Sequence, residues 1–535
     1  MRRFHSYGPV DCRYHFCVER RALVEQCLNQ LVGIPEEGGH YFTIWAPRQA
    51  GKTWIMRQMK KEIAQRYGEQ FTVFDFSFGN LRGMAETITA QWNTFELPQE
   101  LAAILRSDLP GKPEVKTWED FVALFARKGG LWDRPLILLI DEADTAPPVL
   151  LDWIVGRFRE MYLRRETNWL HGLALIGVRA VLGIESKRGS PFNIQRSLHV
   201  PNFTLEEVQD LYQQYQDESG QGIDSAVVEA VYRDTNGQPG LVCWFGELLT
   251  EKYNPGLDQP IAQETWAKVW NAARFLEPNN TVLNLIAKAL SPEYQGFLVK
   301  LFTKADLPFA FHDPLHSYLY LHGIIEPETT QLPDGRYVNN CRFSSPFVQD
   351  TLYHAFSSDL VGNDIPILAL HPLDDLADVF ALPNALDLPA LLRRYKEYLA
   401  RLKAKGINPW KEQPRRQTDL HLLEAVGHFH LYAWLQNAIG RRCAVTPEFP
   451  TGNGRVDLHI GCAGKRGIVE VKSFTDQYQA REDRKQAARY AQRLGFDGVT
   501  MAVFVPIEDE AVLEKLSVRE TVDGVMVSVV AIGWV

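Results

Sequence analysis

The sequence predicts an α/β protein with two separate sheets, and three observations predict it. An apolar strand at 41–45 leads into the loop 46–53 and then a helical stretch, the order found in a phosphate-binding loop. A continuous apolar run at 136–140 ends in acidic residues, as expected for a buried parallel strand. Near the C-terminus, short strands at 455–460 and 467–472 carry two carboxylates and a lysine.

The loop at 46–53 has the composition of a P-loop. Backbone N–H groups of such a loop and of the following helix surround phosphates, Lys52 would reach the terminal phosphates, and Thr53 would help to hold Mg²⁺. Ala46 stands where the usual pattern has its first glycine. The other loop residues expected to contact the nucleotide are Arg48, Gln49, Ala50 and Gly51.

A partner motif ends the apolar run. Asp141 and Glu142 resemble a Walker B element, in which Asp141 would hold Mg²⁺ through water and Glu142 would orient and deprotonate the attacking water. Neighbouring strands are predicted at 71–78 and 173–177, and Thr204 is expected to cap a lid helix. Together these features predict a P-loop ATPase fold with ATP and Mg²⁺ as cofactors.

Residues 8–350 resemble STAND-like and archaeal-type AAA ATPases. The stretch 237–240 is similar to their G-x-P element, which implies that Pro239 packs near the adenine. The stretch 14–20 is similar to a motif that lies close to the nucleotide, which implies a contact from Arg20. Proteins of this group typically assemble or change shape on ATP binding, so the resemblance also implies a homo-oligomer in the ATP-bound state.

The middle of the chain predicts further modules. Helical patterns are followed by short strands at 323–326 and 337–343 with a turn at 333–335, which suggests a winged-helix-like module. Such a module would bind DNA or serve as an interdomain scaffold. The expected domains are 1–200 P-loop ATPase core, 201–274 helical lid, 275–358 winged-helix-like module, 359–388 linker and 389–535 second α/β domain.

The two C-terminal strands are expected to form a hairpin through the turn at 462–465. Asp457 would then lie across from Glu470, and Arg455 across from Lys472, with their Cβ atoms about 5 Å apart. Two carboxylates held so close repel unless a cation lies between them. The pattern therefore predicts a divalent metal beside a lysine that positions or activates water. An exposed hairpin with cross-strand ion pairs is the alternative.

This hairpin resembles the core of the PD-(D/E)XK nuclease superfamily, in which an acidic residue on one strand precedes (D/E)-x-K on the next. A helix at 417–440 before the hairpin, a basic helix at 478–494 after it and a strand at 499–505 give the order of that core. The resemblance implies that residues 389–535 form a PD-(D/E)XK nuclease domain. Val456 stands where the family name has proline.

The resemblance implies a role for each residue of the motif. Asp457 and Glu470 would bind Mg²⁺ or Mn²⁺, and together with Lys472 they would form the catalytic set. Glu424 in the preceding helix is an additional metal ligand or, equally, an ordinary surface glutamate.

Composition limits the partners. The net charge of −9 excludes a generic nucleic-acid coat, so DNA would contact local basic patches. The 7 cysteines show no paired spacing, which suits a reducing cytoplasm and argues against a zinc ribbon. No apolar run has membrane length, so a cytoplasmic protein without a membrane partner is expected. The basic patches are formed by Arg393, Arg394, Lys396, Arg401, Lys403, Lys405, Lys411, Arg415 and Arg416, and by Arg481, Arg484, Lys485, Arg489 and Arg493.

The sequence therefore predicts an ATP-regulated, Mg²⁺-dependent DNA nuclease. A role in defence against phage or in mobile-element DNA metabolism is implied only by the resemblance. Two alternatives stay open: an ATP-binding signalling switch that binds nucleic acid without cleaving it, and a nuclease that cleaves RNA.

Overall fold

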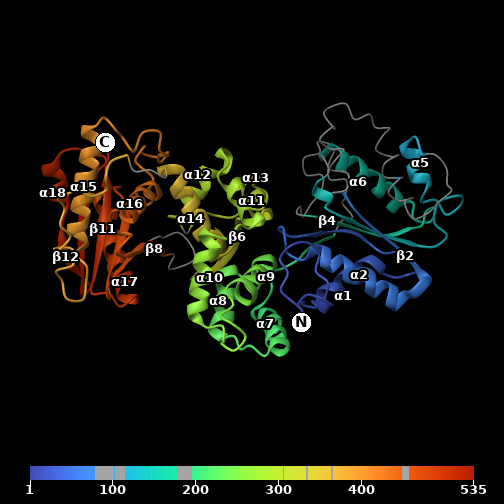
Figure 1. Cartoon of the computed structure of the whole chain (residues 1–535). Coiled ribbons are helices and arrows are strands. Elements are labelled where there is room, and N and C mark those ends of the chain that lie inside the picture. The colour runs from blue at the N-terminus through green and yellow to red at the C-terminus, as the bar shows by residue number, and fades with distance from the viewer. Residues whose placement is uncertain are drawn as a thin grey trace. The chain divides into compact units, whose positions relative to one another are not determined.

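The computed structural model describes residues 1–78, 102, 115–145, 148–177, 196–304, 306–332, 335–362, 366–448 and 457–535. The chain divides into two compact units (Figure 1). Unit 1 comprises Met1–Glu277 with Leu321–Gly323, and unit 2 comprises Pro278–Tyr320 with Ile324–Val535. No helix within the described residues is both long and apolar enough to span a lipid bilayer.

Unit 1 is built on a five-stranded parallel sheet in the order β2–β3–β4–β1–β5. The three central strands β1 (Tyr41–Trp45), β3 (Leu136–Asp141) and β4 (Leu170–Gly177) are buried along their whole length. Continuous burial is expected where helices cover both faces of a parallel sheet. The edge strands are β2 (Thr72–Ser77) and β5 (Arg196–His199). The predicted parallel-sheet core of a P-loop NTPase is therefore confirmed.

Helices pack on both faces of this sheet. The side chains of β3 alternate between two cores: Leu138 and Ile140 pack with α5 and α6, whereas Ile137 and Leu139 pack with α1 and α2. This alternation with period two explains why every position of the run is apolar. The helices are α1 (Arg21–Val32), α2 (Lys52–Tyr67), η1 (Gly68–Gln70), α5 (Trp118–Ala123), η3 (Ala143–Thr145) and α6 (Pro148–Leu163).

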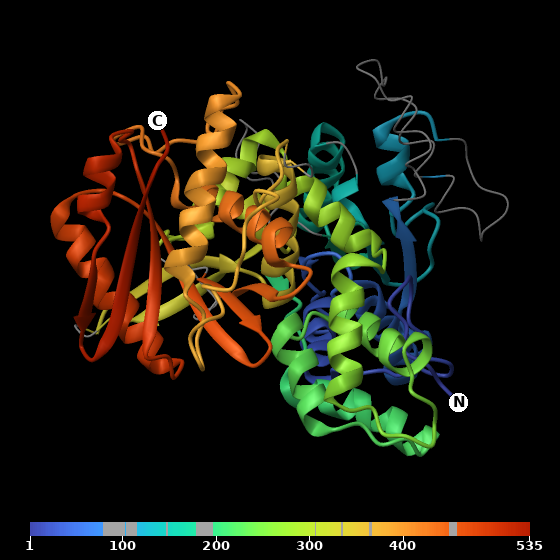
Figure 2. The ribbon, with the colours of Figure 1, turned by 60° about the vertical axis from the view of Figure 1, so that its left-hand side comes forward.

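The helices that follow the sheet gather in one bundle, the lid, drawn in green in Figure 2. The lid consists of α7 (Leu205–Ser219), α8 (Ser225–Thr235), α9 (Pro239–Glu247), the π-helical turn η4 (Leu248–Lys252) and α10 (Gln263–Phe275). α7 begins at the predicted cap, where the Thr204 hydroxyl accepts from the N–H of Glu207 at 3.2 Å and the Glu207 carboxylate accepts from the N–H of Thr204 at 3.0 Å. This reciprocal pair is a capping box.

Unit 2 begins with helices and a two-stranded antiparallel hairpin. The elements are α11 (Asn280–Ala289), α12 (Pro292–Leu301), α13 (Pro314–Leu321), β6 (Ile325–Gln331), β7 (Tyr337–Phe343) and α14 (Pro346–Val361). The first strand of the hairpin lies at 325–331 instead of 323–326. Leu376, Val379 and Leu386 from the expected linker are buried in the same core as α14, α15 and α16.

A six-stranded mixed sheet forms the rest of unit 2, in the order β12–β13–β11–β10–β9–β8. Its strands are β8 (Ala444–Glu448), β9 (Asp457–Cys462), β10 (Lys465–Ser473), β11 (Gly498–Val505), β12 (Arg519–Val522) and β13 (Val525–Gly533). The core on one face includes α15 (Leu388–Ala404) and α16 (Glu424–Ile439), and the core on the other includes α17 (Gln477–Arg493). A short helix, α18 (Glu510–Leu516), contacts β13.

The hairpin of β9 and β10 has the predicted register, with Glu470 paired to Asp457. Its two turn residues, Ala463 and Gly464, have φ values of 47° and 84°. Positive φ at both positions is what a two-residue hairpin turn of type I′ requires. Arg455 lies outside the described residues, so its position opposite Lys472 stays a prediction.

Two pairs of cysteines are joined as disulfides, which differs from the expectation of scattered thiols. Cys12 pairs with Cys17 and Cys443 with Cys462, with Cα–Cα distances of 5.5 and 4.5 Å. The second pair follows directly on the Ala444–Gly461 pair of β8 and β9. Linear spacing did not reveal this cross-strand proximity because it depends on the register of two strands.

The capping box of α7 makes a testable contribution to stability. Thr204→Ala should lower the free energy of unfolding by about 1 kcal/mol, because the N–H of Glu207 loses its acceptor. Thr204→Ser keeps the hydroxyl and should unfold close to the parent. Urea denaturation of the full chain measures both, and identical midpoints for the three proteins would contradict the capping role.

Candidate functional site

A cavity of about 490 Å³ lies in unit 1, lined by the loop after β1, the ends of β2 and β3, the start of α9 and parts of residues 5–20. Its volume falls within the range of roughly 300–1,000 Å³ typical of small-molecule sites. Arg48 is exposed and does not line it. The other predicted nucleotide-site residues do line it: Arg20, Gln49, Ala50, Gly51, Lys52, Thr53, Asp141, Glu142 and Pro239.

The backbone around this cavity is unusual. Arg20, Gln49 and Glu142 are non-glycine residues with positive φ values of 42°, 57° and 52°, and all three line the cavity. Each such conformation costs about 1–3 kcal/mol and is typically found at functional sites. Gly51, with φ at 86°, precedes the first residue of α2, Lys52. The Lys52 ammonium donates to the carbonyl oxygens of its own loop, at 2.8 Å to Ala46 and 2.7 Å to Pro47.

Two predicted metal-binding oxygens meet at the end of the cavity. The Thr53 hydroxyl donates to Asp141 Oδ2 at 2.7 Å, and Asp141 Oδ1 accepts from the N–H of Glu142 at 2.9 Å. Asp141 is buried. Hydroxyl and carboxylate oxygens are the donor types that Mg²⁺ prefers, so this pair fits the metal that the P-loop implies.

The Glu142 carboxylate is exposed and is held from a neighbouring strand. Its Oε2 accepts from the Ser77 hydroxyl at 2.8 Å, and Ser77 pairs with Asp141 where β2 and β3 end. Sequence reasoning missed Ser77. The available signal was that the last residue of a parallel neighbour strand lies at the same sheet edge as the acidic pair.

The stretch 237–240 contacts the P-loop directly. The Gln238 amide donates to the Arg48 carbonyl at 3.1 Å, and the Gly240 N–H donates to the Gln49 carbonyl at 3.1 Å. A side chain at Gly240 would have its Cβ 2.6 Å from the Cβ of Gln49, so only glycine allows this approach. Pro239 is thereby placed in the cavity wall.

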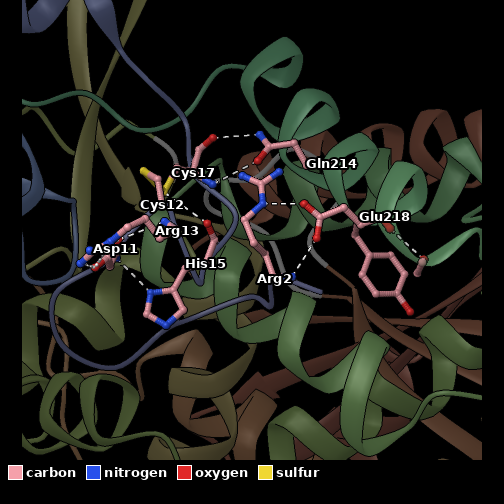
Figure 3. Close-up of polar contacts among 10 residues, drawn as sticks. Arg2, Asp11, Cys12, Arg13, His15, Cys17, Gln214 and Glu218 are labelled. Atoms are coloured by element: carbon pink, nitrogen blue, oxygen red, sulfur yellow. Dashed lines mark hydrogen bonds and ion pairs between the residues drawn. A yellow bond between two sulfur atoms is a disulfide. The ribbon is translucent and has the colours of Figure 1, made fainter.

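Residues 1–18 form a segment that we call the N-terminal strap, and its contacts with the lid were not predicted. Arg2 donates through Nε to Glu218 at 2.6 Å, and the Cys17 N–H and carbonyl bond to the Gln214 side chain at 3.3 and 2.8 Å (Figure 3). The N–H and hydroxyl of Ser6 donate to the Glu247 carboxylate at 2.6 and 2.8 Å. The strap residues that line the cavity are His5, Ser6, Gly8, Pro9, Val10, Phe16, Cys17 and Val18.

Arg20 follows the strap and holds the chain before α7. Its guanidinium donates to the carbonyl oxygens of Pro201 at 2.8 Å and Asn202 at 3.0 Å and lies over the Phe203 ring. Burial lowers the pKa of this guanidinium, and Glu207 partly offsets that effect. The predicted nucleotide contact of Arg20 is therefore accompanied by a structural role.

In unit 2, three predicted residues converge on one ammonium. Lys472 Nζ lies 3.1 Å from Glu424 Oε1 and 3.2 Å from Glu470 Oε1. Glu470 is 3% exposed, and its second oxygen, Oε2, is buried with no hydrogen-bond partner among the described residues. A buried, unpartnered carboxylate oxygen is costly unless a further donor or a cation meets it.

Glu424 is the first residue of α16. Burial raises the pKa of its carboxyl group, the nearby Lys472 ammonium counters that effect, and the carboxylates of Glu470 and Asp483 raise it further. The backbone of Asp457 lies opposite Glu470, but its side chain is outside the described part of the chain. Among the described side chains, no group of three or more His, Cys, Asp or Glu residues is arranged to hold a metal.

Several of the basic residues predicted to contact DNA form ion pairs within unit 2. Arg484 on α17 lies 2.6 Å from Glu520, and Lys485 lies 2.8 Å from Glu482. The other patch shows the same pattern, with ion pairs of Arg394 with Asp378, Lys396 with Glu510, Lys403 with Glu508 and Arg416 with Asp419. Part of the predicted phosphate-binding charge is therefore compensated by the protein itself.

Comparisons with known proteins return distant structural likenesses. No family model and no curated protein matches this chain. Among solved structures, the Walker-type ATPase PABY2304 of Pyrococcus abyssi matches with a TM-score of 0.40 and 14% identity, over 65% of this chain and 98% of that chain. The Aeropyrum pernix ORC1 protein in complex with DNA matches at 0.31 and 13% identity (64% and 93%), and the Thermotoga maritima RuvB Holliday junction branch migration motor at 0.32 and 15% (60% and 92%). The sheet order β2–β3–β4–β1–β5 and the loop between β1 and α2 define the P-loop NTPase fold of unit 1.

The buried carboxyl group of Glu424, whose raised pKa the Lys472 ammonium partly counters, should make the stability of unit 2 depend on pH. The raised pKa of Glu424 means that the folded state binds a proton more readily than the unfolded state, whose pKa is near 4.5. The stabilisation that results from this proton binding is fully present below about pH 4.5 and is lost as the pH rises through the raised pKa of Glu424. Lys472→Met should raise this pKa further, so its loss of unfolding free energy relative to the parent should be about 2–4 kcal/mol at pH 8 and smaller at pH 5.

Urea denaturation of the full chain at the two pH values measures this loss. Lys485→Met, which removes an exposed ammonium paired with Glu482, is the matched control and should cost less than about 1 kcal/mol at both. A loss for Lys472→Met that does not change with pH would contradict the shared-ammonium interpretation.

Proposed function

We propose that unit 1 binds and hydrolyses ATP with Mg²⁺, and that the nucleotide state of unit 1 controls a metal-dependent nuclease site in unit 2. The observation that carries the ATPase is the meeting of Thr53 and Asp141 in the cavity that Lys52 and Glu142 also line. Four side-chain types needed for phosphoryl transfer to water are thus brought from two separate strand ends to one place.

Each residue of unit 1 has a distinct role in this proposal. Lys52 would exchange its two loop carbonyls for the terminal phosphates, assisted by the N–H groups of the loop and of α2. Thr53 and Asp141 would hold Mg²⁺, which neutralises phosphate charge. Glu142, once released from Ser77, would orient the attacking water and accept its proton. Pro239 would pack near the adenine, and Arg20 would lie close to the nucleotide.

Two substitutions separate ATP binding from hydrolysis. Lys52→Ala should weaken ATP binding by about 100-fold or more, because the main point charge on the terminal phosphates is lost. Glu142→Gln should bind ATP but hydrolyse it about 100-fold or more slowly, because the amide cannot accept a proton. Calorimetric binding and phosphate release measure the two effects, with Lys61→Ala on the same helix as the control. Hydrolysis by Glu142→Gln at the parent rate would show that another residue is the general base.

The nuclease is supported by the buried carboxylate of Glu470, whose Oε2 is unpartnered among the described residues and whose neighbour is Lys472. Asp457 is at the directly opposed strand position, where Cβ atoms are typically about 5 Å apart. Glu470, Asp457 and Glu424 would hold Mg²⁺ or Mn²⁺, which supplies Lewis-acid stabilisation of the phosphate. Lys472 would position the water. Arg481, Arg489 and Arg493 of α17, beside the ion-paired Arg484 and Lys485, support a nucleic-acid substrate, which we propose to be DNA.

A conservative substitution tests this site. Glu470→Gln should lower cleavage of labelled DNA by at least about 100-fold in Mg²⁺ or Mn²⁺ while leaving ATP binding unchanged, because a charged ligand is lost from unit 2 alone. Glu482→Gln removes an exposed charge from α17 and should cleave like the parent. Cleavage by Glu470→Gln at the parent rate would contradict the proposal that Glu470 binds the metal of a nuclease site.

The same assay separates the rival functions. Binding of DNA by the parent without cleavage under any nucleotide condition would favour the ATP-binding signalling switch, and cleavage of RNA alone would favour the ribonuclease. Control by nucleotide requires that ATP stabilise one conformation or oligomer over another. Sedimentation with ATP, ADP and no nucleotide, alongside cleavage rates, measures that control. A nucleotide-restrained DNA nuclease would suit defence against phage or mobile-element DNA.

A further inference from the structure

The strap joins two parts of unit 1 that meet at the cavity. Cys12 packs against the core formed by α1, α2 and the sheet. Cys17 is bound through both its N–H and its carbonyl to Gln214 of α7, in the lid (Figure 3). The disulfide between them therefore connects a contact with the core to a contact with the lid.

The disulfide shortens this connection. It holds the two Cα atoms 5.5 Å apart. Five Cα–Cα steps in an extended chain would reach about 17 Å, so a reduced strap allows a much wider separation. A turn anchored on Asp11, whose carbonyl accepts from the N–H groups of Tyr14 and His15, also shapes this stretch, but it ends before Cys17.

We propose that Cys12 and Cys17 form a redox-controlled latch that, as a disulfide, slows the release of nucleotide from the cavity in unit 1. The inference rests on the proposed nucleotide site. Cys17 itself lines the cavity, so a change in the position of the strap changes the cavity wall. Cys17 also stays joined to α1 of the core through residues 18–20, so opening the latch removes the shorter of two links between the lid contact and the core; lid mobility commonly limits ligand release.

The chemistry of the latch is thiol–disulfide exchange. A dithiol reductant attacks one sulfur as a thiolate, the Cys12–Cys17 bond breaks, and a mixed disulfide forms. The second thiol of the reductant then displaces the bound cysteine, so two electrons and two protons pass from the reductant to the two cysteine thiols. A low-molecular-weight disulfide such as oxidised glutathione reverses the reaction.

Greater solvent access favours thiol–disulfide exchange at Cys12–Cys17 over exchange at the other cysteines. Cys12 and Cys17 are only partly buried, whereas Cys443 and Cys462 are each 5% exposed and lie in unit 2. Cys243 lines the same cavity, but burial raises its pKa to about 12, which leaves little reactive thiolate near neutral pH. The second disulfide therefore provides a matched control within the same chain.

The test measures nucleotide release from the full chain. Protein loaded with a fluorescent ADP analogue and Mg²⁺ is chased with excess ATP, after treatment with oxidised glutathione or with a dithiol reductant. Mass spectrometry of the strap peptide verifies each state. Reduction should raise the release rate of the parent about 3- to 10-fold. Cys12→Ser/Cys17→Ser should release rapidly in both conditions, and Cys443→Ser/Cys462→Ser should respond like the parent.

The outcomes distinguish the latch from the site on which it rests. Binding of the analogue with equal release rates in verified oxidised and reduced parent would overturn the latch alone. Failure of Cys12 and Cys17 to form a disulfide with oxidised glutathione would also overturn it. Absence of analogue binding in both states would overturn the proposed nucleotide site and the latch with it. If the double variant does not fold, the single variant Cys12→Ser replaces it with the same expected result.

Discussion

The parallel pairing of β3 with β4 and of β4 with β1 is the constraint on which unit 1 depends. Parallel strands end at the same edge of a sheet, so the residues after β1 and those at the end of β3 meet although about ninety positions separate them in sequence. The 2.7 Å hydrogen bond between Thr53 and Asp141 is the direct result. The parallel pairing of β2 with β3 has a similar effect, because it brings the Ser77 hydroxyl beside the Glu142 carboxylate.

Much of this arrangement could be predicted because it follows from local patterns. A continuous apolar run identifies a buried strand, the P-loop pattern identifies the junction between β1 and α2, and Thr204 with Glu207 identifies a helix start. The β9–β10 register followed from the length of one turn, since a two-residue turn fixes every later pair. These features are encoded within a few residues of each other.

The contacts that could not be predicted join segments with no shared local pattern. The strap bonds to the lid across about two hundred positions, through Arg2 to Glu218 and Cys17 to Gln214. Neither an arginine near an N-terminus nor a glutamine within a helix indicates such a partner. The Cys443–Cys462 disulfide depends on cross-strand placement, which cysteine spacing alone does not reveal, whereas the Cys12–Cys17 disulfide closes a short local loop of the strap.

The two candidate sites share a way of holding a lysine. Lys52 is bound by two carbonyl oxygens of its own loop, and Lys472 lies between the carboxylates of Glu424 and Glu470. In each case the ammonium satisfies oxygens that would otherwise be desolvated without a partner. An anion entering the first site gains an ammonium and must replace its bonds to neutral carbonyls. A cation that enters the site in unit 2 must compete with the Lys472 ammonium for carboxylate oxygens. That ion pair is harder to displace than the hydrogen bonds of Lys52 to neutral carbonyls. In the proposed nucleotide site, phosphate would therefore meet an ammonium held only by neutral carbonyls, whereas a metal at the proposed nuclease site would require that Lys472 move or share its partners.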